Sequence, residues 1–238
     1  MQVIICVLLV IGFAIYGLSV FMKITVIEVS GTMSYTDEEI ITASGIAIGD
    51  NLLFLNTGRM TNSILAALPF INEVRIIRMP PDSIRIEVTE SIEIAAVSIK
   101  NNIFIIDSNS KVLRITDEIP AGLIEIKGVE LLDVPEGDLL KSELGAETHL
   151  LYMKDVLKAI EREGIQSDIS YLDVSNITYI HFGYINRFRV ILGGPSNVRG
   201  KLERLSDHVV WVNTNYSPEE TGDIHLIDPN DPKFYQSN

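Results

Sequence analysis

The order of apolar and polar residues divides the chain into an apolar N-terminal run and two longer mixed segments. Residues 3–22 read VIICVLLVIGFAIYGLSVFM and contain no charged side chain. About 20 helical residues rise roughly 30 Å, which is the thickness of a bilayer core. A cleaved signal peptide would have a basic start, a shorter apolar run and a small-residue cleavage site, and the sequence shows none of these. The pattern therefore predicts an uncleaved transmembrane signal anchor over residues 1–23.

The segment that follows carries strand and helix signals in the order strand, helix, helix, strand, strand. Thr36 and Glu39 have the spacing of a capping box, and Gly45 is placed to end the helix that this box begins. Apolar residues alternate with polar ones around Ile86, which predicts a sheet with one buried face. The expected elements span residues 24–30, 36–44, 58–68, 71–79 and 83–90. Together they predict a small α+β domain over residues 24–91.

The remainder of the chain is dominated by short strand candidates separated by turn residues. They span residues 92–99, 103–106, 111–115, 123–127, 169–174, 178–183, 187–192 and 222–227. A helix with one apolar face fits residues 147–163, and Pro195 opens a last helix that carries Leu202 and Leu205. This pattern predicts a mainly antiparallel β domain with two helices over residues 92–228, followed by a polar tail over residues 229–238.

Composition narrows the classes of partner. The chain has 19 Lys and Arg against 32 Asp and Glu, a net charge of −13, so it repels phosphate backbones and we expect no nucleic-acid partner. Charged residues make up 21% and hydrophobic residues 47%, which excludes disorder as the main state. The single cysteine, Cys6, cannot form an intrachain disulfide.

A search for catalytic and ligand-binding motifs gives no candidate. None of the four histidines has a second ligand at metal spacing. The Gly193-Gly194-Pro195 turn lacks the Lys-Ser/Thr of a phosphate-binding loop, and no Gly-x-Ser-x-Gly motif marks a nucleophile. We therefore expect no catalytic residue, no metal, no cofactor and no small-molecule substrate.

Several stretches resemble the FtsQ/DivIB family of bacterial cell-division proteins. Residues 24–90 resemble the POTRA domain of that family, and parts of the later segment resemble its β domain. The matching stretches are IEVSG (27–31), YTDEEI (35–40), LPFI (68–71), PDSIRIEVTE (81–90), RFRVILG (187–193), KLERL (201–205) and GDIHL (222–226). With the predicted anchor, the resemblance covers nearly the whole chain.

The resemblance implies a single-pass membrane protein of the division septum, with a cytoplasmic N-terminus and an extracytoplasmic POTRA and β domain. It further implies a non-catalytic scaffold that binds FtsL-like and FtsB/DivIC-like partners and supports septal wall synthesis. The residues alone leave a second class open, a membrane-anchored envelope enzyme such as a wall hydrolase with a POTRA-like docking module. A deep polar cleft would favour the enzyme, whereas an exposed edge strand would favour the scaffold.

The last strand candidate, residues 222–227, is the predicted partner site. A terminal strand often forms a sheet edge, whose unpaired N–H and C=O groups can add a strand from another chain. Asp228 and Pro229 end the strand, and the tail beyond them carries two aromatic residues. The expected partner-binding residues are Asp223, His225, Ile227, Asp228, Phe234 and Tyr235. The other interpretation of the same residues is a capped edge followed by a frayed tail.

Overall fold

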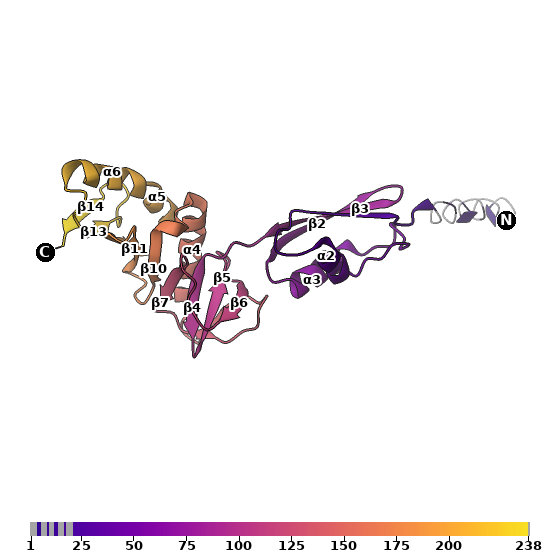
Figure 1. Cartoon of the computed structure of the whole chain (residues 1–238), viewed down its shortest axis with the longest axis horizontal. Helices are drawn as coiled ribbons and strands as arrows, with labels where there is room; N and C mark the ends of the chain where they lie inside the picture. The colour runs from indigo at the N-terminus through magenta and orange to yellow at the C-terminus, as the bar shows by residue number, and fades with distance from the viewer. Residues whose placement is uncertain (1–3, 6–8, 10–11, 14–16, 18–20, 238) are drawn as a thin grey trace. The chain divides into compact units, whose positions relative to one another are not determined.

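The computed structural model describes all residues except 1–3, 6–8, 10–11, 14–16, 18–20 and 238 (Figure 1). Most of the predicted anchor therefore lies outside the described residues. Within the part of the chain that is described, no helix is both long enough and apolar enough to cross a membrane. The chain divides into two units, Met1–Ser91 and Ile92–Asn238.

The first unit is a three-stranded sheet with two helices. Its elements are β1 (Val26–Ser30), α2 (Asp37–Ser44), α3 (Thr57–Ala67), β2 (Ile71–Met79) and β3 (Ser83–Glu90). The strand order is β1-β3-β2; β3 runs parallel to β1 and antiparallel to β2. Ile40 of α2 and Ile64 of α3 are fully buried in one cluster with Ile84 and Ile86 of β3. The predicted α+β pattern of this segment is confirmed.

Local hydrogen bonds account for where α2 begins and ends. The Thr36 hydroxyl accepts from the Glu39 backbone N–H at 3.3 Å, and the Glu39 carboxylate accepts from the Thr36 N–H at 2.8 Å. This is the predicted capping box, which satisfies two backbone donors at the helix start. Gly45 follows the helix with φ of 71°, a conformation that favours glycine.

Glu90 fastens the loop between β1 and α2 to the end of β3. One carboxylate oxygen accepts from the Thr32 hydroxyl and from the Met33 and Ser34 N–H groups, each at 2.8 Å. The other oxygen accepts from the Ser34 hydroxyl at 2.7 Å. Burial alone would raise the pKa of Glu90, but these hydrogen bonds outweigh burial and hold the pKa below its ordinary value.

The second unit is built on one nine-stranded sheet. Its strands are β4 (Ala95–Ile99), β5 (Asn102–Ile106), β6 (Val112–Thr116), β7 (Ile124–Lys127), β10 (Ile169–Asp173), β11 (Ile180–Tyr184), β12 (Phe188–Gly193), β13 (Gly222–His225) and β14 (Lys233–Gln236). The order is β14-β13-β12-β11-β10-β7-β4-β5-β6. Five of the eight neighbouring pairs are antiparallel, so the predicted mainly antiparallel character is correct. A separate pair, β8 (Leu131–Leu132) and β9 (Lys141–Ser142), lies between β7 and α4 in the sequence.

Helices cover the core of this unit. The apolar face of α4 (Glu147–Glu163) buries Met153, Val156, Leu157 and Ile160 in the same cluster as the strands. The single last helix that the sequence predicts is in fact two, α5 (Val198–Glu203) and α6 (Leu205–Asn215). The buried Lys201 ammonium donates to the carbonyls of Leu192 and Gly194 at 2.7 and 2.8 Å, which fixes α5 to the end of β12. Burial lowers the pKa of Lys201.

The sequence prediction is wrong about the C-terminal edge. Residues 222–227 were expected to form the sheet edge and residues 229–238 a polar tail, but the tail contains β14, which pairs antiparallel with β13. The strand β13 ends at His225 and has a neighbour on each side. The physical reason is the Phe234 ring, which packs on Phe188 and Tyr216 and so gives the tail an apolar contact that holds it in place.

Because the two units have separate hydrophobic cores, we expect each to unfold independently of the other. Ile86 is fully buried, so Ile86→Asp places an unpaired carboxylate in the first core and should cost about 4 kcal/mol or more. We expect hydrogen exchange of the full chain to show lost protection in residues 24–90 and retained protection in residues 92–238. Thr89→Asn, at an exposed position of the same strand, is the control and should change neither segment; a neutral residue is chosen because Glu73 lies directly opposite. Equal loss in both units would show that they unfold as one.

Candidate partner-binding edge

The strand β14 is the open edge of the nine-stranded sheet at its C-terminal side. The Ser237 N–H donates to the Thr221 carbonyl at 3.0 Å, and this bond shows which opposing residues of β13 and β14 form the hydrogen-bonded pairs. Because hydrogen-bonded and non-hydrogen-bonded pairs alternate between antiparallel strands, Lys233 and Tyr235 bond to β13. The N–H and C=O groups of Phe234 and Gln236 then face away from the sheet. The edge therefore offers two donors and two acceptors to an added strand.

One face of β14 is held against the core. The Phe234 ring lies 4.9 Å from the Tyr216 ring and 5.9 Å from the Phe188 ring, measured between centroids, with both pairs edge to face. Gly222 of β13 pairs with Gln236, and a Cβ on Gly222 would come within 2.2 Å of the Tyr235 carbonyl oxygen and 2.7 Å of the Phe234 ring. Only glycine permits this close approach, so the absence of a side chain at position 222 lets β14 pair closely with β13.

The other face of β14 is polar and aromatic. Tyr235 is 52% exposed, and its ring centroid lies 4.7 Å from that of His225 on β13. The Asp223 carboxylate accepts hydrogen bonds from the Arg189 guanidinium on β12. The hydrogen bond to Asp223 raises the pKa of Arg189 above its ordinary value. This face therefore presents an ion pair and two adjacent rings.

Ile227 and Asp228 lie in the loop between β13 and β14. The Ile227 side chain is 55% exposed and lies over Gly193, where a Cβ would come within 3.0 Å of Ile227 Cγ1. The Asp228 carboxylate accepts from the Asn230 N–H at 2.9 Å and shapes the turn that reverses the chain. Both residues flank the edge without belonging to a strand.

The structure thus brings the six predicted residues to one edge of the sheet, but their positions relative to the edge strand and the role of Phe234 differ from the prediction. Asp223 and His225 lie on the second strand from the edge, and Tyr235 on the edge itself. The sequence predicts that Phe234 offers its ring to a partner, whereas in the structure the ring is partly buried and packs against the core. Gln236, which sequence reasoning missed, supplies half of the outward backbone groups, and its side chain donates to Glu220 at 2.7 Å.

A second feature that sequence reasoning missed is a cavity of about 330 Å³ between α6 and the β13–β14 loop. Trp211 is 47% exposed and stacks on His208, with ring centroids 5.3 Å apart; Pro229 and Pro232 line the same cavity. A signal was present: residues 209–212 read VVWV, and a helix cannot turn four successive apolar residues toward one core. In the described part of the chain, no group of three or more His, Cys, Asp or Glu is placed to hold a metal ion.

Comparison with known proteins finds a family model that matches the first unit and relatives that cover most of the chain. The family model "POTRA domain, FtsQ-type" matches residues 22–91. The chain is 25% identical to the cell division protein DivIB of Clostridium tetani over 185 residues, which cover 77% of this chain and 68% of the relative. It is 25% identical to DivIB of Clostridium acetobutylicum over 191 residues, 80% of this chain and 74% of the relative. It is 24% identical to the cell division protein FtsQ of Geotalea daltonii over 226 residues, 91% of this chain and 78% of the relative.

His208 makes the stability of this edge depend on pH. Burial lowers the pKa of His208 below 6.5, and among the described residues its buried Nε2 has no hydrogen-bond partner. The unfolded chain therefore binds the proton first, so the free energy of unfolding should fall as pH drops through 6.5.

The matched variant is His208→Phe, which keeps a ring on Trp211 and removes the titrating group. Chemical denaturation of both proteins between about pH 7 and about pH 5 should show a loss in the wild type that exceeds that in the variant by up to about 2 kcal/mol. Carboxylates contribute equally to both proteins, so parallel pH profiles would show that His208 is not the cause.

Proposed function

The chain belongs to the FtsQ/DivIB family of cell division proteins, and from this premise we propose that it acts as a non-catalytic scaffold of the division complex. The relatives support a role in cell division. The scaffold assignment is supported by the open edge of the second unit, where an exposed tyrosine adjoins unpaired backbone groups. The protein would hold membrane partners together and support septal wall synthesis through them.

In this proposal the chain crosses the cell membrane once. The charge-free run of residues 3–22 supports a signal anchor with a cytoplasmic N-terminus. Both units then lie outside the cytoplasm, at the division septum. The absence of a cysteine beyond Cys6 is compatible with this placement, because stability rests on the two apolar clusters and not on disulfides.

The proposed partners are an FtsL-like and an FtsB/DivIC-like protein. We propose that a strand of the FtsB/DivIC-like partner adds to β14, pairing with the outward N–H and C=O groups of Phe234 and Gln236. Tyr235 and Ile227, each more than half exposed, would supply the side-chain contacts. The single observation that carries this function is the free edge of β14.

The test is Gln236→Pro, compared with Gln236→Ala. Proline removes the N–H that faces outward but none of the inferred bonds to β13, and edge strands tolerate it at such positions. Alanine removes only the side chain and its bond to Glu220. When the chain is co-expressed with the FtsL-like and DivIC-like proteins of the same genome, we expect Gln236→Pro to lose their co-purification and Gln236→Ala to retain it.

Stability is measured in parallel, because the comparison requires that both variants fold. Each should unfold within about 0.5 kcal/mol of the wild type, as surface substitutions do. A folded Gln236→Pro protein that co-purifies with its partners as well as the wild type would place the binding surface elsewhere.

A further inference from the structure

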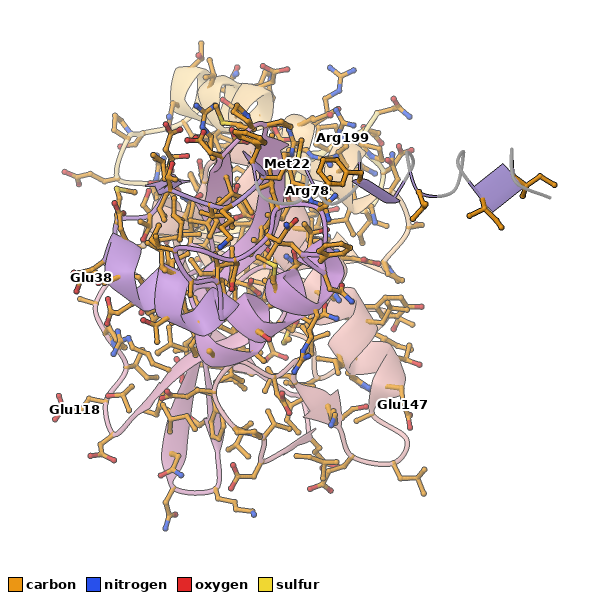
Figure 2. All side chains as sticks on the ribbon, turned by 90° about the vertical axis from the view of Figure 1, so that its right-hand side faces the viewer. Met22, Glu38, Arg78, Glu118, Glu147 and Arg199 are labelled. Atoms are coloured by element: carbon orange, nitrogen blue, oxygen red, sulfur yellow. The ribbon has the colours of Figure 1, made fainter. Side chains whose placement is uncertain are left out.

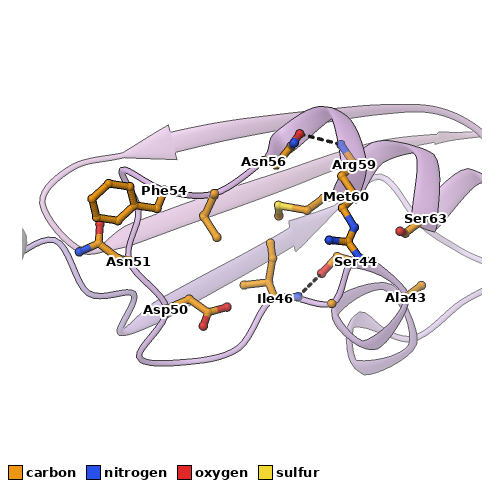
Figure 3. A pocket seen from close by; sticks show the side chains of 12 residues that line it. Ala43, Ser44, Ile46, Asp50, Asn51, Phe54, Asn56, Arg59, Met60 and Ser63 are labelled. Atoms are coloured by element: carbon orange, nitrogen blue, oxygen red, sulfur yellow. Dashed lines mark hydrogen bonds between the residues drawn. The ribbon is translucent and has the colours of Figure 1, made fainter.

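The loop between α2 and α3 exposes three large apolar side chains. Ile48 is 63% exposed, Leu53 48% and Phe54 74%. Single exposed apolar residues are ordinary, but three within seven positions of one loop are a concentration that calls for an explanation. We call Ile48, Leu53 and Phe54 the apolar tip. Figure 3 shows Phe54 at one end of a cavity of about 520 Å³, away from Ala43 and Ser63.

The apolar tip lies beside the point where the chain enters the first unit. The Leu52 N–H donates to the Met22 carbonyl, the Ile24 N–H to the Asp50 carbonyl, and the Gly49 N–H to the Ile24 carbonyl, each at 2.8 Å. Lys23 and Asn51 form an isolated antiparallel bridge. Residues 22–24 are thus bonded directly to residues 49–52, within the loop that carries the tip. The apolar N-terminal run therefore ends next to three exposed apolar side chains.

The same end of the first unit carries basic residues. Lys23 is the first charged residue after the apolar run, and the Arg78 guanidinium donates to the Leu55 carbonyl at 2.7 Å. Figure 2 labels Arg78 and Met22, which both contact residues 52–55. Arg59 lines the same cavity as Phe54 but lies at its other end, on the side of Ser63 (Figure 3). In a chain of net charge −13, two cations, Lys23 and Arg78, are bonded to the loop that carries the apolar tip, and the Asp50 carboxylate of that loop accepts from the Ala47 N–H. Apolar side chains flanked by cations suit the headgroup region of an anionic bilayer.

From these observations we propose that the apolar tip inserts into the interfacial layer of the membrane that holds the anchor. This inference rests on the membrane anchoring proposed above. The anchor supplies the argument for lipid as the occupant, because it keeps a bilayer surface within a few residues of the tip at all times. Insertion would give the first unit a fixed orientation on the membrane, set by two attachments, the tip and the anchor, instead of by the anchor alone.

The experiment measures quenching of tryptophan fluorescence by brominated lipids in the full chain. Trp211→Phe removes the only tryptophan, and Phe54→Trp then places one at the tip. The protein is reconstituted as one copy per nanodisc of phosphatidylethanolamine and phosphatidylglycerol, with or without bromines near the headgroup end of the acyl chains. Met33→Trp in the same background is the matched control, because Met33 is 96% exposed and follows the far end of β1, roughly 20 Å along the strand direction.

We expect Phe54→Trp to be quenched roughly two- to threefold more than Met33→Trp, as for side chains in the headgroup layer. A third variant, Phe13→Trp, reports the anchor itself; it is measured in discs whose lipids carry bromines near the ends of the acyl chains, because residue 13 lies midway along the apolar run. Strong quenching at position 13 with equal, weak quenching at positions 54 and 33 would overturn the tip proposal and leave the anchor intact. Absence of quenching at position 13 would overturn both. A blue shift of the emission from position 54 that appears only when two copies share a disc, without quenching by the bromines, would assign the tip to a second copy and overturn lipid insertion.

Discussion

The pairing of β7 with two parallel neighbours holds the second unit together. This strand has four residues, and Ile126 lies opposite Val97 of β4 on one side and Leu172 of β10 on the other. Parallel neighbours need a long connection, and the segment that contains α4 is the connection from β7 to β10. Gly128 follows β7 with φ of 78°, and a Cβ there would come within 2.0 Å of the Ser175 hydroxyl. The two halves of the sheet therefore join where glycine lets the backbones meet.

Because β7 joins the two halves into one open sheet, that sheet has two edge strands, β14 and β6. Toward the C-terminal end, the strands from β10 to β14 lie side by side in sequence order. The last of them, β14, has a neighbouring strand on one side only. One partly buried ring, that of Phe234, holds this strand against the core. An edge held in this way keeps its outward backbone groups ordered, which lowers the entropy cost that a partner strand must overcome. The order of β14 and the proposed addition of a partner strand thus depend on the same contact.

The elements that could be predicted from the sequence are those whose signals are local. The helix α4 and the strands β2 and β3 fall at their predicted residues, because periodicity, a glycine stop and flanking prolines mark them. The split of the last helix and the strand β14 could not be predicted in this way. Phe234 gains its stability from Phe188 and Tyr216, which are distant in the sequence, so no local pattern distinguishes it from an aromatic residue in a tail. The strand that the sequence predicts as the sheet edge, β13, is therefore one strand away from the edge that the structure has, β14.

The measurement that tests the edge most directly is amide-resolved hydrogen exchange of residues 233–237, with and without the DivIC-like partner. In the free chain, the amides of Lys233, Tyr235 and Ser237 should exchange slowly, because they bond to β13 and to the Thr221 carbonyl, whereas those of Phe234 and Gln236 should exchange fast. Binding should slow Phe234 and Gln236 selectively. A complex that forms while these two amides remain fast would contradict the account.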